Sequence, residues 1–337
     1  MFPCFCDVKV VLKNFDYSAT LNSSRSAPRT RAYNSAVASE SYFRVSYSAI
    51  RILSESKAAP PALTAVLHLL CKELHWDIGL VWTIDHQAVA MACEAIWNSG
   101  DFNNFETVSR SRKFVPGEGT PGTIWLMKRP IWAKQLSELP SFPRLSVARM
   151  DGLKSGVFVP IKSGERILGV LELLSATEKP LDAEMLAFLE SLGIQVGAFM
   201  AHLRADEALN ASEQKFRSLA DSVPYAIFTI DEHSQILYAN SAADKTFGYR
   251  PGGLIGQNLT VVIPERLRDA HRNGIRRFVE TGKRKLDWRA IRLPALHRSG
   301  RTVHVEIAFE VFYHDGRPTF TGFAKEIAEM TRPVLPA

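Results

Sequence analysis

The chain of 337 residues is 46% hydrophobic and 23% charged, which excludes a wholly disordered protein and is typical of two globular domains. Its net charge of +6 is modest for this length and does not indicate nucleic-acid binding by itself. Charged or polar residues interrupt the most apolar stretches, Pro61–Leu70 and Met185–Leu203, so no membrane-spanning segment is expected.

The N-terminal residues 1–45 differ in composition from the rest of the chain. The segment Ser18–Ser41 is rich in Ser, Arg, Ala and Asn and shows no apolar period, which is typical of disorder. We therefore expect a disordered tail over residues 1–45. An Arg-rich targeting segment is the alternative interpretation.

Residues 50–205 are expected to form the first domain. Apolar residues from Leu63 to Leu74 recur at helical spacing, which predicts an amphipathic helix with one buried face. A glycine-containing turn cluster, Val115–Thr123, precedes a short helix. The strands expected in this domain are Asp77–Ile84, Met91–Trp97, Pro130–Ala133, Gly156–Ile161 and Arg166–Leu174, with a turn near His86 and Gln87. This order predicts an antiparallel sheet covered by helices, in the α+β class.

A long helix is expected to follow, capped by Asp182, and the segment 182–219 is predicted to connect two domains. Six of its apolar residues have the 4, 3, 4, 3, 4 spacing of a coiled-coil seam. These residues are Met185, Leu189, Leu192, Val196, Phe199 and Leu203. Two interpretations stay open: the seam lies on the domain's own sheet, where Gly193 and Gly197 suit close packing, or it forms a homodimer. Both hold if one end packs on the sheet and the other extends into a dimer.

Residues 213–331 are expected to form a second domain, followed by a tail at 332–337. A hairpin, short helical turns, a basic amphipathic helix and three strands again predict a small antiparallel sheet with helices on one face. The expected elements are Tyr225–Ile230, Gln235–Ala239, the helix Glu265–Glu280, and the strands Lys285–Leu293, Thr302–Phe312 and Thr319–Lys325.

The first domain resembles the GAF domains found beside PAS domains in bacterial two-component sensors. The resemblance lies in GEGTPGTIW (Gly117–Trp125), FPR (Phe142–Arg144) and GLKSGVFVPIKSGERILGVLELLS (Gly152–Ser175). In the first of these, Gly117, Gly119 and Gly122 permit a tight loop that other residues resist.

The second domain resembles a PAS domain. The matching stretches are ILYANSAADKTFGYRPGGLIGQNLTVVIPE (Ile236–Glu265) and FTGFAKEIAEMTRP (Phe320–Pro333). In the family, the asparagine after the second strand caps the next helical turn, and Asn240 stands at that place. The candidate ligand-binding residues in this domain are Asn240, Phe247, His271, Trp288, Arg289 and Phe309.

His271 is the sharpest of these candidates. In oxygen-sensing haem members of the PAS family, a histidine at the matching place is the proximal haem ligand, so the resemblance makes haem a candidate cofactor. The following strand, KLDWRAIRL, departs from those members, because their ligand-side arginine has no clear counterpart in it. A partly exposed structural histidine is the alternative. Trp288 and Arg289 are placed on the strand that lines the pocket, where Trp288 either gates a cavity or belongs to the core.

The GAF-like domain is rich in aromatic residues. Five of them are candidates to surround a small planar ligand, and a well-filled core is the alternative. These residues are Trp82, Trp97, Trp125, Trp132 and Phe158. Neither a cyclic-nucleotide signature nor a chromophore-linking context for Cys93 is found.

Several expectations about chemistry and location rest on absent motifs. No P-loop, kinase ATP-binding box, phospho-acceptor histidine block or nucleophile motif is found, so no catalytic output is expected in this chain. Cys4, Cys6, Cys71 and Cys93 lack a metal-binding pattern, which favours a reducing cytoplasmic setting. The basic run from Arg266 to Lys285 is interpreted as a solvated face, with nucleic-acid binding disfavoured.

The sequence therefore predicts a sensor that binds a small ligand or partner and relays the change through the connecting helix. It is expected to form a homodimer and to work with a histidine kinase or response regulator, with no membrane partner. The alternatives are the input half of a sensor histidine kinase and a haem-based PAS gas sensor.

Overall fold

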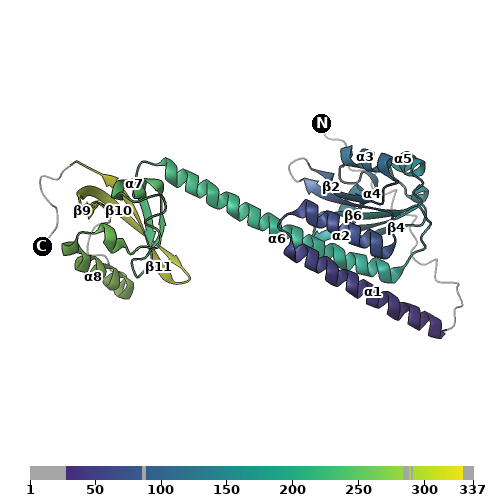
Figure 1. The fold of residues 1–337 in the computed structure, drawn as a ribbon, viewed down its shortest axis with the longest axis horizontal. Helices are drawn as coiled ribbons and strands as arrows, with labels where there is room; N and C mark the ends of the chain where they lie inside the picture. Colours follow the sequence, from purple (N-terminus) through teal and green to yellow (C-terminus); the bar gives the residue numbers. More distant parts are fainter. Residues whose placement is uncertain (1–27, 86–88, 284–287, 290, 329–337) are drawn as a thin grey trace, which may run out of the picture. The chain divides into compact units, whose positions relative to one another are not determined.

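The computed structural model describes residues 28–85, 89–283, 288–289 and 291–328 (Figure 1). The chain divides into two compact units after Ala205. Each unit is built around one antiparallel sheet with helices against it, so the predicted α+β class is confirmed. Cys4, Cys6, the turn at His86 and Gln87, and the C-terminal tail lie outside the described residues.

The first unit has a six-stranded sheet in the order β3-β2-β1-β6-β5-β4. Its strands are β1 (Ile78–Asp85), β2 (Ala90–Asn98), β3 (Lys113–Phe114), β4 (Ile131–Ala133), β5 (Ser155–Ser163) and β6 (Arg166–Ser175). The five strands expected from the sequence agree with β1, β2, β4, β5 and β6 to within two residues at each end. The central strands β1 and β6 are buried along nearly their whole length, because helices cover both faces of the sheet.

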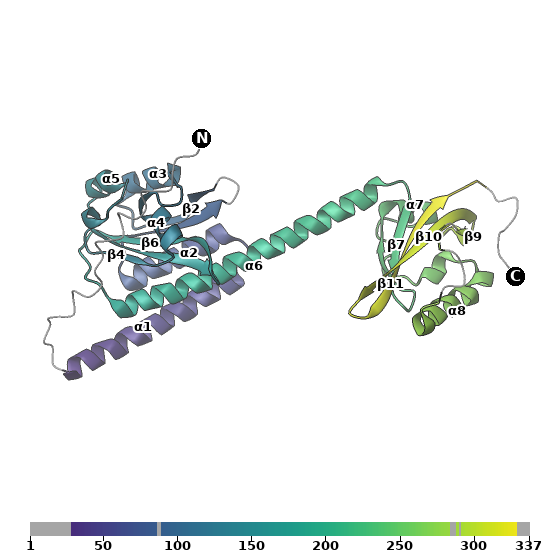
Figure 2. The same cartoon turned by 180° about the vertical axis from the view of Figure 1, so that it is seen from behind.

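The helices of the first unit form two layers (Figures 1 and 2). One face is covered by α1 (Pro28–Glu55), α2 (Ala59–Leu74) and the first part of α6 (Ala183–Ser222). The other is covered by α3 (Asn103–Ser111), α4 (Gly119–Met127) and α5 (Leu145–Met150), with a short 3₁₀ turn, η2, at Leu136–Glu138. Each layer encloses its own apolar cluster against the sheet.

The prediction of a disordered tail is wrong for residues 28–45, which belong to helix α1. This helix contains no glycine, and its single proline is its first residue, where the missing N–H costs nothing. Val45, Ala49 and Leu53 lie four residues apart and are buried against the first unit's core. Packing of that stripe supplies the stability that the Ser- and Arg-rich composition did not reveal.

The loop that precedes α4 needs its glycines. Gly117 and Gly119 adopt φ of 85° and 59°, which other residues rarely tolerate. A Cβ on Gly122 would lie 2.2 Å from the carbonyl oxygen of Val115. The tight glycine loop expected from the sequence is therefore confirmed.

Helix α6 begins at the predicted cap, where Asp182 Oδ1 accepts a hydrogen bond from the Met185 amide at 2.9 Å. Leu189, Leu192 and Val196 are buried in the cluster beneath α1 and α2. A Cβ on Gly193 or Gly197 would lie 2.5 or 2.1 Å from a backbone carbonyl oxygen of β5. The predicted seam therefore packs on the domain's own sheet, as the first interpretation had it.

The second half of α6 has a different environment, since every residue from Ala205 to Leu219 is exposed. Among the described residues, α6 is long and apolar enough to cross a membrane by length and composition, contrary to the expectation from the sequence. Core helices of soluble proteins pass the same test, and the apolar residues of the first half of α6 fill such a core.

The second unit has a five-stranded sheet in the order β8-β7-β11-β10-β9, with its helices against one face. Its strands are β7 (Ala226–Ile230), β8 (Ile236–Ala239), β9 (Ile291–Leu296), β10 (Thr302–His314) and β11 (Arg317–Glu326). Its helical segments are α7 (Ser241–Phe247), η3 (Leu259–Val262) and α8 (Glu265–Thr281). The alternating burial of β7 and β11 follows from one face meeting those helices while the other meets solvent.

One strand boundary differs from the prediction. Trp288 and Arg289 were expected on a strand, but they lie in a turn and β9 begins only at Ile291. The carbonyl of Trp288 accepts a hydrogen bond from the Phe309 amide at 2.9 Å, and the regular ladder between β9 and β10 starts at Ile291. Other residues of the predicted strand, 285–287 and 290, lie outside the described part of the chain.

Candidate functional site

A cavity of about 550 Å³ lies between α8 and the inner face of the second unit's sheet. Its sheet side is apolar throughout, with Phe228, Val305, Ile307 and Phe320 in the floor. Its polar lining residues come from α8 and the residues just after it; they are His271, Asn273, Arg277 and Lys283. An enclosed apolar volume with a few polar groups on one side is the usual form of a small-molecule site.

Four of the six predicted residues line this cavity: Phe247, His271, Trp288 and Phe309. Trp288 packs on Phe278, Phe309 and Phe320 with ring centroids 5.0, 6.2 and 6.1 Å apart. It therefore belongs to the aromatic core and forms part of the cavity wall at the same time. The two remaining predicted residues, Asn240 and Arg289, are not among those that line the cavity.

Asn240 is buried and joins three elements instead of contacting the cavity. Its Oδ1 accepts hydrogen bonds from the amides of Ala243 and Ile227, both at 2.9 Å, so the predicted helix cap is confirmed. Its Nδ2 donates to the carbonyls of Ala220 and Tyr225 at 2.8 and 2.9 Å. The last turn of α6 is thereby bonded to β7 and α7 through one side chain, which the sequence did not reveal.

His271 makes a specific contact at the cavity edge. Its Nε2 lies 2.9 Å from the hydroxyl of Ser234, a buried residue in the turn between β7 and β8. Burial, and secondarily the nearby Arg272, lowers the pKa of His271 below its ordinary value. The ring is therefore neutral at neutral pH and forms a hydrogen bond across the end of the cavity.

The five aromatic candidates in the first unit do not form one site. Trp82 and Phe158 are buried on the α3–α5 face of the sheet, with Trp125 packed against the same cluster. Trp97 and Trp132 pack on the opposite face, against the cluster covered by α1, α2 and α6. The sheet separates the two groups, so the prediction that the five surround one planar ligand is wrong.

The centre of the α3–α5 face holds a buried ion pair that the sequence analysis missed. Arg144 Nη2 lies 2.9 Å from both carboxylate oxygens of Glu172, and the two side chains are 1% and 0% exposed. Trp82 Nε1 donates to the same carboxylate at 2.6 Å, and Arg144 Nη1 donates to the Ser109 hydroxyl at 2.9 Å. The signal in the sequence was a glutamate inside the apolar strand β6 together with the arginine of the FPR motif.

Four aromatic rings surround this arginine. The Arg144 guanidinium carbon lies 4.8 to 5.3 Å from the ring centroids of Trp82, Phe105, Phe114 and Phe142. Cation–π attraction strengthens in such a dry setting, and it partly offsets the cost of removing the charge from water. An arginine of the chain itself therefore occupies the space between sheet and helices in this unit.

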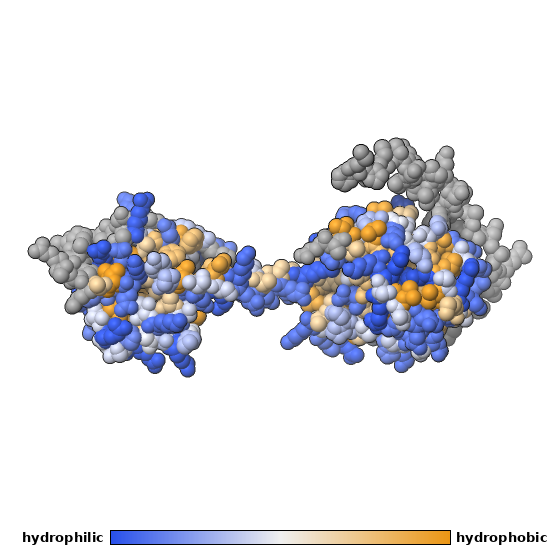
Figure 3. Space-filling model, turned by 90° about the horizontal axis from the view of Figure 1, so that it is seen from above, coloured by the Kyte–Doolittle hydropathy of each residue, from blue (hydrophilic) through white to orange (hydrophobic). Residues whose placement is uncertain are grey.

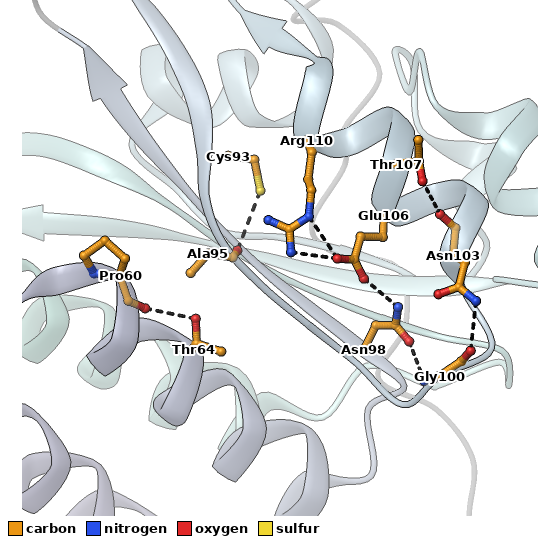
Figure 4. Close-up of polar contacts among 10 residues, drawn as sticks. All are labelled: Pro60, Thr64, Cys93, Ala95, Asn98, Gly100, Asn103, Glu106, Thr107 and Arg110. Atoms are coloured by element: carbon orange, nitrogen blue, oxygen red, sulfur yellow. Dashed lines mark hydrogen bonds and ion pairs between the residues drawn. The ribbon is translucent and has the colours of Figure 1, made fainter.

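A polar network holds α3 beside this cage, as Figure 4 shows. Glu106 accepts hydrogen bonds from Asn98 at 2.7 Å and from Arg110 at 2.9 and 2.7 Å. Asn98 lies at the end of β2, so the contact ties α3 to the sheet and keeps Ser109 within reach of Arg144. Cys93, drawn in the same view, donates to the carbonyl of Ala95, and burial followed by Glu172 raises the pKa of its thiol to about 12.

Comparison with known families agrees with this division of the chain. A GAF domain model matches residues 62–201, and a PAS fold model matches residues 214–327. The chain carries a GAF domain followed by a PAS domain.

Two curated relatives are named as sensors. The chain is 29% identical over 126 residues to Sensor protein FixL of Bradyrhizobium diazoefficiens, covering 37% of this chain and 25% of that protein. It is 24% identical over 139 residues to Oxygen sensor protein DosP of Escherichia coli, covering 40% of this chain and 17% of that protein. The chain thus spans a quarter or less of the length of these two relatives.

Solved structures also match the GAF domain. One is the GAF domain of a phosphoenolpyruvate-protein phosphotransferase from Coxiella burnetii, at 20% identity, 50% of this chain, 98% of that chain and a TM-score of 0.45. Another is free methionine-R-sulfoxide reductase from Neisseria meningitidis, at 15% identity, 49% of this chain, 91% of that chain and a TM-score of 0.42.

The PAS cavity can be tested for its fit to haem, which the family resemblance made a candidate. A haem ligand must direct a free imidazole nitrogen at the iron. Here Nε2 of His271 is bonded to the Ser234 hydroxyl, so ligation by this nitrogen requires that buried contact to break. The arrangement of His271 in this structure therefore does not fit a haem ligand.

The buried ion pair predicts a large effect on the stability of the GAF domain. Replacing Arg144 by Met leaves the Glu172 carboxylate buried without its cation, and we expect the free energy of unfolding to fall by about 3–5 kcal/mol. The matched control Arg149→Met, on the exposed side of α5, is expected to change it by less than about 0.5 kcal/mol. Urea unfolding followed by circular dichroism measures both. Equal effects of the two variants would show that the pair has no special role.

The His271 contact predicts a pH dependence of PAS stability. Because the folded-state pKa lies below the ordinary 6.5, the unfolded chain binds the proton more readily. The stability contributed by the neutral ring is fully present above about pH 6.5 and is lost as the pH falls through the folded-state pKa. We expect the urea midpoint of the PAS transition to drop from about pH 7.5 to about pH 5.5, and His271→Gln to reduce that drop. The exposed His233 serves as control, since His233→Gln should keep the full pH dependence.

Proposed function

We propose that this chain is a sensory signal-transduction protein whose PAS cavity binds a small, largely apolar ligand. The observation that carries the proposal is the enclosed cavity beside α8, in a domain whose sheet is bonded to the last turn of α6 through Asn240. The sensor names of two relatives support it. We place the protein in the cytoplasm, the usual setting of GAF and PAS domains.

The relay in this proposal runs through Asn240. Ligand contacts with Phe228 and Phe247 reach β7 and α7, and Asn240 bonds both elements to Ala220 of α6. A small shift of β7 or α7 must move or break those hydrogen bonds, because a buried amide leaves no water to replace them. The GAF domain takes part as the body on which the first half of α6 is packed.

No catalytic step is assigned to this chain. The relatives extend well beyond the matched regions, so an enzymatic output on a neighbouring or continuing segment is compatible with the proposal. We propose the input half of a sensor histidine kinase as the second candidate, with a kinase or response regulator as partner. The haem alternative is not retained, because His271 is committed to Ser234.

The proposed ligand site is tested with 1-decanol as a neutral apolar probe. We expect it to raise the midpoint of PAS unfolding and to slow amide hydrogen exchange around the cavity and in residues 216–222. The variant Ala295→Phe fills the cavity from its sheet side and should abolish both effects. If decanol has no effect on the wild-type protein, the cavity is not a ligand site.

The relay is tested with two asparagine variants. Asn240→Ala should still bind decanol but lose the response of residues 216–222, because the bonds to Ala220 and Tyr225 are gone. Asn258→Ala is the matched control, since Asn258 caps η3 and has no bond to α6. A response in residues 216–222 that survives in Asn240→Ala would contradict the relay.

We also propose that the exposed second half of α6 mediates homodimerisation. Figure 3 shows hydrophobic residues among the hydrophilic surface of both domains. On α6 these include Leu209, Phe216 and Leu219, each about 60% exposed and spaced seven and three residues apart, as on one coiled-coil face. This stripe replaces Met185–Leu203, which is engaged with the GAF sheet.

The dimer proposal predicts that Leu209→Glu shifts the protein to monomer, since a charge enters the apolar contact. Gln214→Glu places the same side chain on the opposite face of the helix and should leave the dimer intact. Sedimentation at several concentrations measures both. A wild-type protein that stays monomeric at the highest concentration contradicts the proposal.

A further inference from the structure

We infer that the ligand of the PAS cavity is an amphipathic anion, with an apolar body and one carboxylate or similarly charged group at its end. The inference rests on the proposed function, in which this cavity is a ligand site. It adds the chemical class of the ligand, which the apolar walls alone leave open.

The distribution of polar groups around the cavity is one-sided. Every lining residue contributed by β7, β9, β10 and β11 is apolar, from Phe228 on β7 to Phe320 on β11. The aromatic group of Phe278, Trp288 and Phe320 closes one wall. A ligand must therefore bury an apolar body against the sheet and direct any polar group toward α8, since an unpaired polar atom on the sheet side is costly.

The charged groups at the α8 edge have a single sign. Arg277 and Lys283 line the cavity, whereas no Asp or Glu does so among the described residues. Other arginines of this domain are paired, as Arg292 is with Glu306 at 2.8 Å and Arg272 with Asp269 at 3.2 Å. The side chains of Arg277 and Lys283 have no such partner within the described residues, so their charge is available to a ligand.

The remaining polar groups favour the same ligand. Asn273, also at this edge, offers an amide N–H to a carboxylate. His271 is turned to Ser234 and adds no competing negative charge. A cationic ligand would meet two like charges here, while a neutral ligand would leave them unused. The geometry thus favours an anion at the α8 edge over either alternative.

Three probes with the same ten-carbon chain separate these cases: decanoate, 1-decanol and decylamine. Binding of each to the full chain is measured by isothermal titration calorimetry at low and high salt. We expect decanoate to bind at least tenfold more tightly than decylamine, and added salt to weaken decanoate alone, because exposed charges are screened.

The variants Arg277→Gln and Lys283→Gln should each weaken decanoate about three- to tenfold and leave 1-decanol unchanged. Arg276→Gln is the matched control, because Arg276 is the neighbouring exposed arginine on α8 and does not line the cavity. Thermal unfolding of each variant verifies that the fold is retained, as expected for exposed side chains.

The outcomes distinguish the inference from the function beneath it. Equal affinity for the three probes, or equal weakening of decanoate by the Arg276 and Arg277 variants, overturns the anionic ligand while the cavity remains a ligand site. If none of the probes binds, or if binding persists in Ala295→Phe, the proposed ligand site itself is overturned.

Discussion

One unbroken helix, α6, belongs to both domains, and the remainder of the structure depends on how its two ends are held. At its start, Leu189, Leu192 and Val196 are sealed against the GAF sheet, and two glycines bring the helix to within contact of the β5 backbone. At its end, Ala220 is hydrogen-bonded to Asn240 at the base of the PAS sheet. A helix transmits rotation or translation along its axis, because each turn is hydrogen-bonded to the next.

The two domains solve the same packing problem in opposite ways. Both place helices over an antiparallel sheet, which leaves a space that side chains must fill. In the GAF domain, the chain fills it with Arg144, surrounded by four rings and paired with Glu172. In the PAS domain, about 550 Å³ stays open between α8 and the sheet. This difference assigns ligand binding to the PAS domain and a structural role to the GAF cage.

The buried ion pair also shows why charge can sit in an apolar core. Moving an isolated carboxylate out of water costs several kcal/mol, so Glu172 is tolerated only with its partners in place. Arg144 and Trp82 satisfy its oxygens, and Ser109 takes a further donor of the guanidinium. These groups come from four separate elements, so the pair stabilises one arrangement of β1, α3, β6 and the residues before α5 over others.

The sequence by itself determined the two-domain α+β architecture, most strand positions, the Asp182 and Asn240 caps, the glycine loop and four of the six predicted PAS site residues. These follow from local signals, since apolar period, turn residues and caps act over a few positions. Helix α1 escaped because its only specific signal, the stripe at Val45, Ala49 and Leu53, takes effect through packing on distant strands.

Only the tertiary structure decided which residues meet. It separated Trp97 from Trp82 by a sheet, brought Arg144 to Glu172, joined Asn240 to α6 and gathered Arg277 and Lys283 at one cavity edge. Contacts of this kind join residues from different elements across the sheet or the core. Spacing along the chain carries no information about them, because they arise from the order of strands and from which face each side chain takes.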